Sequence, residues 1–87
     1  MATLQEFQSL VGQTVRIKAS PLARRGSRTP ERIRVRGGSD GSFKVLGVTT
    51  AFRGASSTLT GKPAVHFDSL DGKWGGWLPL EEIELVP

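Results

Sequence analysis

Apolar and basic residues alternate in two segments of the chain. In Val15-Arg16-Ile17-Lys18-Ala19 and in Ile33-Arg34-Val35-Arg36, each aliphatic residue is followed by a cation or a small residue. A period of two is typical of a strand, because successive side chains of a strand point to opposite faces. We therefore predict strands over residues 14–19 and 32–36, with their cations on one shared face of a sheet.

Shorter patterns predict the remaining elements. Thr3-Leu4-Gln5-Glu6 has the spacing of a capping box, so a short helix is expected over residues 3–11, with Gly12 at its end. Asp-Gly turns and short apolar runs predict further strands over residues 43–48, 64–68, 74–78 and 83–86. The segment Pro79-Leu80-Glu81-Glu82 suits a single 3₁₀ turn before the last of these strands.

Two connections stand out by their length and composition. Residues 20–31 form a long and strongly basic loop between the two basic strands, with Pro21 and Pro30 near its ends. Loops of about a dozen residues are uncommon in small domains and often serve a function. Residues 54–62 are mostly small and polar, which predicts a mobile loop.

The composition is that of one small domain rich in turns. The chain has 87 residues, of which eleven are Gly and five are Pro. A chain of this size can bury only one core, so we predict a single domain over residues 1–87. The many turns and short strands favour an all-β fold with five to six strands.

The charge is distributed unevenly along the chain. Residues 1–54 contain ten Lys or Arg and three acids, a balance of +7, whereas residues 55–87 contain two and five, a balance of −3. A molecule polarised in this way can bind an anionic partner, pair with a second copy of itself, or neutralise its own charge internally. The overall charge does not choose among these three.

Neither a redox-dependent nor a membrane-bound protein is expected. The chain has no Cys, and it contains neither a secretion signal nor a run of eighteen apolar residues. We therefore expect a cytoplasmic protein that does not engage a membrane.

The chemistry-bearing residues are too sparse to predict an enzyme. His66 and Asp68 share the outer face of their strand, but a metal site needs three or four ligands and only carboxylates such as Asp71 could be added. No Ser lies in a motif that would orient it against His66. We therefore expect no catalytic site, no metal, no cofactor and no small-molecule substrate, although a site built across an oligomer stays open.

The two Trp residues are candidate aromatic contacts. Trp74 and Trp77 lie three positions apart, so on one strand they point to opposite faces unless Gly75-Gly76 forms a bulge. One indole should then pack in the core while the other is free to contact a partner. The sequence does not show which of the two is exposed.

The closing segment resembles that of the SH3-like small barrels. In Gly76-Trp77-Leu78-Pro79-Leu80-Glu81-Glu82-Ile83-Glu84-Leu85-Val86, an aromatic residue and a proline precede a 3₁₀ turn and a final strand, as in that superfamily. The resemblance is strongest over residues 76–86 and implies a small barrel with a long first loop. It does not imply the binding of proline-rich peptides, because the chain has no Tyr for such a groove.

The basic residues favour a binding function. Between Arg16 and Arg36 the chain carries eight cations and one acid, Glu31. We expect this face and loop to contact the phosphate backbone of DNA or RNA with little dependence on sequence. The predicted contact residues are Arg16, Lys18, Arg24, Arg25, Arg28, Arg32, Arg34 and Arg36.

Two alternatives remain for the same basic surface. It could dock on an acidic protein or join copies of the chain into a homo-oligomer, which would make the protein an assembly module. It could also be neutralised internally, because an SH3-like barrel places the last strand beside the first and so brings Glu84 near Arg16 or Lys18.

Overall fold

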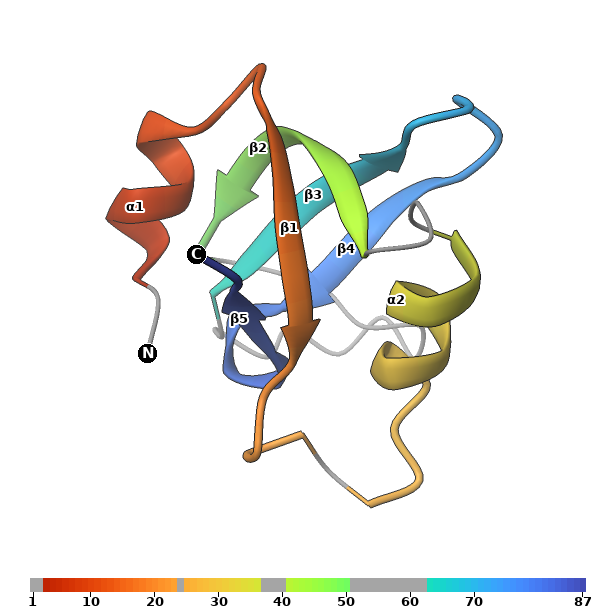
Figure 1. Cartoon of the computed structure of the whole chain (residues 1–87). Helices are drawn as coiled ribbons and strands as arrows, with labels where there is room; N and C mark the ends of the chain where they lie inside the picture. Colours follow the sequence, from red (N-terminus) through yellow and green to blue (C-terminus); the bar gives the residue numbers. More distant parts are fainter. Residues whose placement is uncertain (1–2, 24, 37–40, 51–62) are drawn as a thin grey trace.

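The protein is described by a computed structural model over residues 3–23, 25–36, 41–50 and 63–87 (Figure 1). These residues form five strands, two α-helices and one 3₁₀ turn. In chain order these are α1 (Leu4–Ser9), β1 (Thr14–Ala19), α2 (Thr29–Arg36), β2 (Ser42–Thr49), β3 (Ala64–Ser69), β4 (Gly75–Pro79), η1 (Leu80–Glu82) and β5 (Ile83–Leu85). The predicted mobile loop over residues 54–62 lies outside the described residues.

All five strands belong to one antiparallel sheet with the order β4-β3-β2-β1-β5. Strand β1 changes partner along its length: residues 14–16 pair with β2, and residues 17–19 pair with β5. This places the last strand beside the first, as the resemblance to the SH3-like barrels implied. Strands β4 and β5 form the two edges of this sheet, so a closed barrel is not confirmed.

The core is built from nearly every element of the described chain. Its buried side chains come from both helices and all five strands: Phe7, Ile17, Ile33, Phe43, Val45, Val65, Phe67, Leu78 and Ile83. Three phenylalanines occupy its centre, where the ring of Phe67 lies 5.8 Å from that of Phe7 and 5.7 Å from that of Phe43. Burial of aromatic rings is the largest single source of apolar contact in a core of this size.

The N-terminal helix α1 forms where the capping pattern predicts it. The hydroxyl of Thr3 accepts a hydrogen bond from the Glu6 N–H at 3.2 Å, and the side chain of Phe7 is fully buried. Gly12 follows the helix with a φ of 88°, in the left-handed region that favours glycine. The chain then returns to the sheet, where the Gly12 N–H donates to the carbonyl of Val45 at 2.8 Å.

The strand predicted over residues 32–36 is wrong, because this segment is helical in α2. Ile33 is buried, as predicted, but Val35 is 60% exposed, so the two aliphatic residues do not share a face. Only four residues carried the alternation, and a helix can produce the same short pattern by chance. The loop predicted over residues 20–31 is correspondingly shorter, because Thr29 already begins the helix.

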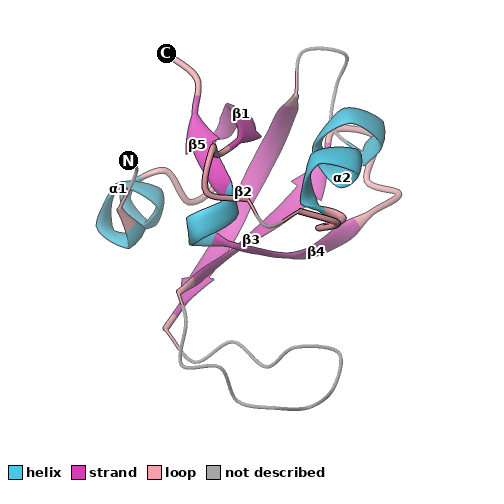
Figure 2. Ribbon diagram, turned by 90° about the horizontal axis from the view of Figure 1, so that it is seen from below, coloured by secondary structure: helices cyan, strands magenta, loops and turns pink. Residues whose placement is uncertain are grey.

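The two helices lie at opposite ends of the sheet in both views of the molecule (Figures 1 and 2). Helix α1 lies near the chain termini, and α2 lies at the far end. Neither these helices nor η1 has the length and apolar character needed to cross a membrane.

Candidate anion-binding site

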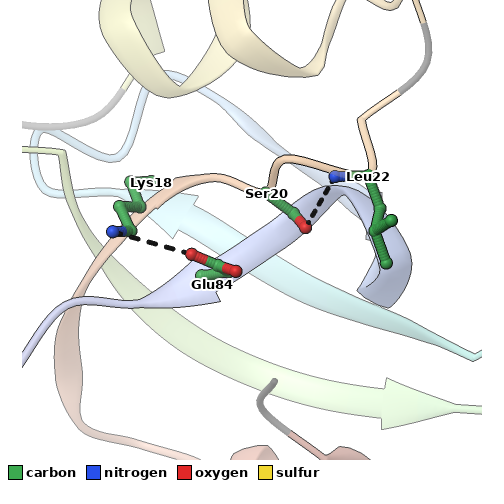
Figure 3. A network of polar contacts seen from close by, with 4 residues as sticks. All are labelled: Lys18, Ser20, Leu22 and Glu84. Atoms are coloured by element: carbon green, nitrogen blue, oxygen red, sulfur yellow. Dashed lines mark hydrogen bonds and ion pairs between the residues drawn. The ribbon is translucent and has the colours of Figure 1, made fainter.

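The cations of β1 lie on its outer face, as predicted, but they contact the C-terminal segment. The Nζ of Lys18 lies 3.6 Å from Oε2 of Glu84, its neighbour across the β1–β5 pairing (Figure 3). The guanidinium of Arg16 donates to the carbonyl oxygen of Pro87 at 2.7 Å. An exposed ion pair of this kind adds little stability, at most about 1 kcal/mol, but it does compensate part of the charge of this strand.

Four of the other arginines lie on and just before α2. Arg32, Arg34 and Arg36 are exposed residues of the helix, and Arg28 immediately precedes it. Residues four apart share a helix face, so Arg28, Arg32 and Arg36 form one stripe with a rise of about 6 Å per step. Arg34 falls on the opposite flank of the helix.

The prediction that the cations share one continuous face of two neighbouring strands is therefore wrong. The cations form two groups: Arg16 and Lys18 on β1, and the arginines around α2. The physical reason is the helix itself, because a rotation of about 100° per residue distributes Arg32, Arg34 and Arg36 around an axis instead of along one face. Of the loop cations, Arg25 is exposed, while Arg24 lies outside the described residues.

Two contacts hold α2 on the rest of the molecule. Ile33 joins the core with Ile17 of β1, and the hydroxyl of Thr29 donates to Oε2 of Glu82 at 3.0 Å. Both Thr29 and Glu82 are buried, so this is a shielded hydrogen bond to a carboxylate, a strong type. The same Glu82 accepts at its carbonyl oxygen from the N–H of Ser20, which follows β1, at 2.9 Å.

The segment between β1 and α2 begins with a compact turn. The Ser20 hydroxyl accepts from the N–H of Leu22 at 3.1 Å (Figure 3), and the Ser20 carbonyl oxygen accepts from the N–H of Ala23 at 2.9 Å. This turn fixes the exit of the chain from β1, so the basic segment leaves from a defined place.

The turn between β3 and β4 positions Trp74. The Trp74 N–H donates to the Ser69 hydroxyl at 3.1 Å, and the Trp74 carbonyl oxygen accepts from the Ser69 N–H at 2.8 Å. That hydroxyl in turn donates to Oδ1 of Asp71 at 2.6 Å, which also accepts from the Lys73 N–H at 3.0 Å. These hydrogen bonds, from Ser69 first and then from Lys73, lower the pKa of Asp71 below its usual value of 3.8.

The two Trp side chains point to opposite faces, as predicted. Trp74 packs on the core, with its ring centroid 5.7 Å from that of Phe43 at an interplanar angle of 68°. Trp77 lies on the outer face of β4 and stacks on His66 of β3, with ring centroids 4.8 Å apart. Both indoles remain partly exposed.

His66 and Asp68 lie on the outer face of β3, opposite Trp77 and Gly75 of β4. A methyl group placed on Gly75 would lie 3.8 Å from both Nε2 of His66 and Oδ1 of Asp68, so these two polar groups flank the same glycine. Across residues 3–23, 25–36, 41–50 and 63–87, no cluster of three or more His, Cys, Asp or Glu side chains could hold a metal ion.

Comparison with known proteins does not identify a relative of this chain. No protein-family model matches it, and neither the curated proteins nor the solved structures give a match. The function is therefore argued from the site alone.

The sequence carried signals for α2 that the strand prediction did not use. Pro30 and Glu31 lie in the first helical turn, Arg34 and Arg36 lie in the last, and Gly37 follows in the sequence. Proline is favoured at the start of a helix, acids at its N-terminus and cations at its C-terminus. Together these signals would have outweighed a four-residue alternation.

Proposed function

We propose that the protein binds the phosphate backbone of nucleic acid through the arginines around α2, without catalysis. One observation carries this proposal: Arg28, Arg32, Arg34 and Arg36 are all exposed, and within the described residues none of these guanidinium groups pairs with a carboxylate. Arg25, in the segment before α2, is also exposed and adds a further positive charge to this group of arginines. A cytoplasmic location belongs to this proposal.

Arginine suits this role better than lysine would. Its planar group donates to two phosphate oxygens at once and is weakly hydrated, so little solvation is lost on binding. The spacing of the α2 stripe places three such groups along about 12 Å, which allows contact with successive phosphates of one strand.

We also propose that the sheet belongs to the SH3-like small barrels. The support is the pairing of the last strand with the first, and the 3₁₀ turn η1 that links β4 to β5. The helix α2 between β1 and β2 would then be an insertion in the long first loop of such a barrel. The fold alone does not specify a ligand, and the proposed function does not depend on it.

The test is a fluorescence-anisotropy titration of labelled DNA and RNA at several salt concentrations. Three phosphate contacts predict that log K falls with log salt at a slope of about −2 for a single strand and about −3 for a duplex. The double variant R32Q/R36Q should weaken binding to every nucleic-acid sequence alike and reduce the steepness of that slope by about 1 to 2.

The matched control is R16Q/K18Q, which removes two charges from β1 in place of two from α2. Arg16 and Lys18 already contact the C-terminal segment, and at about 0.15 M salt, where the Debye length is near 8 Å, exposed charges outside the binding site are screened. The control should therefore keep its affinity within about twofold. Equal weakening by both double variants would show that only net charge matters and would overturn the α2 site.

The rival function is docking on an acidic protein or on a second copy of the chain. Val35, 60% exposed between the arginines of α2, favours it, because apolar residues beside Arg are common at protein interfaces. Size-exclusion chromatography after nuclease treatment separates the two functions. A stoichiometric, nuclease-resistant assembly whose formation needs Val35 would favour docking.

A further inference from the structure

A hollow of about 410 Å³ opens between α2 and the turn that precedes β4. Among the described residues, its lining combines the arginine stripe of α2 with an aromatic residue, an aliphatic residue and an acid: Arg28, Arg32, Arg36, Trp74, Val35 and Glu31. Arg34 is not part of this lining. The volume falls in the range of about 300 to 1,000 Å³ that is usual for small-ligand pockets.

Trp74 is held firmly in this hollow. A methyl group added to Gly76 would lie 2.9 Å from Cζ2 of the indole, so the ring lies directly over the Gly76 backbone. Phe43 contacts it from the core side, and the backbone of Trp74 is hydrogen-bonded to Ser69. The indole is therefore already held in one place before a ligand binds.

The lining does not suit a simple polyanion. Arg28, Arg32 and Arg36 attract phosphate, but Glu31 repels it, and Val35 and Trp74 gain nothing from it. A ligand with both a charged part and a flat apolar part satisfies the whole set. A nucleotide has both parts, because its phosphate can bind the arginines and its base can pack on the indole. The N–H groups of the base can also donate hydrogen bonds to the carboxylate of Glu31.

We infer that this hollow takes one unpaired nucleotide of a single strand, with its base against Trp74 and its flanking phosphates on Arg28, Arg32 and Arg36. This inference rests on the proposed function and narrows it from nucleic acid in general to single strands. In a duplex both faces of each base are stacked on neighbours, so the indole has no base face to contact.

The first test leaves the protein unaltered and changes only the probe. An oligothymidylate is compared with an abasic strand of the same length, which carries the same phosphates and no bases. Stacking contributes about 1–3 kcal/mol per base, so the normal strand should bind at least about fivefold more tightly. It should also bind more tightly than a duplex of equal length at the same salt.

The second test observes Trp74 directly. The chain has two Trp residues, so the W77F variant leaves Trp74 as the only indole, and its fluorescence should be quenched by the normal strand and not by the abasic strand. The W74F variant, which keeps Trp77, should show no such quenching. K44Q serves as the charge control, because Lys44 is an exposed residue of β2 outside the hollow and its loss should not change the preference for bases.

The outcomes separate this inference from the proposed function. Salt-dependent binding with equal affinity for normal and abasic strands, and no quenching of Trp74, would overturn the inference and leave phosphate binding intact. Absence of binding to any strand would overturn both. Binding of an acidic polypeptide in preference to every strand would overturn the inference in favour of protein docking.

Discussion

At the scale of single residues, Gly41 is the most closely packed of the described glycines. It is buried at the start of β2 with a φ of 79°, and a methyl group there would lie 2.6 Å from the Ile17 carbonyl oxygen and 3.6 Å from Cγ2 of Ile33. Its own carbonyl oxygen accepts from the Ile17 N–H at 3.1 Å. Only glycine lets β1, β2 and α2 meet at this point.

The residue-scale prediction compares Gly41→Ala with Gly72→Ala. Gly72 also has a positive φ, 71°, but a methyl group there meets nothing within 4 Å. The free energy of unfolding of G72A should therefore fall only by the cost of placing alanine in a left-handed backbone conformation, about 1–2 kcal/mol. G41A adds a clash with the β1 backbone, so its free energy of unfolding should fall by about 1–3 kcal/mol more than that of G72A. Urea denaturation measures both, and equal losses would contradict the close approach at Gly41.

At the scale of elements, α2 depends on its contacts with the rest of the molecule. It spans eight residues, too few for a helix to be stable alone in water. Ile33 packs in the core, and the hydroxyl of Thr29 donates a hydrogen bond to Glu82 of η1. The positions of Arg28, Arg32 and Arg36 are therefore well defined only while these contacts hold α2 in place.

The element-scale prediction is that Thr29→Val loosens α2 selectively. Valine keeps the shape of threonine but leaves the buried Glu82 carboxylate without this donor, which costs about 1.5–3 kcal/mol. Hydrogen exchange should accelerate more in α2 than in β3. Thr29→Ser retains the hydroxyl and should keep most of the protection. Uniform acceleration across α2 and β3 would mean that α2 is not a separable element.

At the scale of the whole molecule, one core unites the sheet, α1 and α2. Ile83 from β5 and Phe7 from α1 are both fully buried in it, although they lie near opposite ends of the chain. Since the described elements share this core, we expect one cooperative transition for global unfolding, in addition to the local opening of α2. The two groups of cations lie on different elements: Arg16 and Lys18 of β1 contact the C-terminal segment, whereas the other group lies on and just before α2.

The prediction at this scale is cooperative unfolding, with Ile83→Ala destabilising every element equally. Removal of a buried isoleucine side chain costs about 2–5 kcal/mol. Urea curves followed by Trp fluorescence and by far-UV circular dichroism should coincide in the wild type and in I83A. Leu22→Ala, at a side chain 63% exposed, should change stability by no more than about 0.5 kcal/mol. Separate transitions would contradict a single core.

Much of the fold follows from local patterns. The helix after Thr3, the five strands and the turn η1 all lie within a few residues of their predicted places, because capping residues, Asp-Gly turns and apolar alternation act over short distances. The opposite orientations of Trp74 and Trp77 follow in the same way from the period of a strand.

The site was predicted less well than the fold. The sequence identified the arginines as exposed cations, and those that the structure describes are exposed, but it placed Arg32, Arg34 and Arg36 on a strand that is a helix. The error matters for function because it changes which cations are neighbours. Neither the stripe of Arg28, Arg32 and Arg36 nor its position beside Trp74 could be read from an alternation of four residues.

The amino-acid sequence by itself determined that the protein is a small, mostly β domain with a marked basic segment, because composition, charge and turn chemistry are properties of the chain. Only the tertiary structure decided where those charges act. Glu84 reaches Lys18 through the pairing of the last strand with the first, and Trp74, in the β3–β4 turn, lines one hollow with the α2 arginines. Such contacts join residues distant in sequence, so no local pattern encodes them.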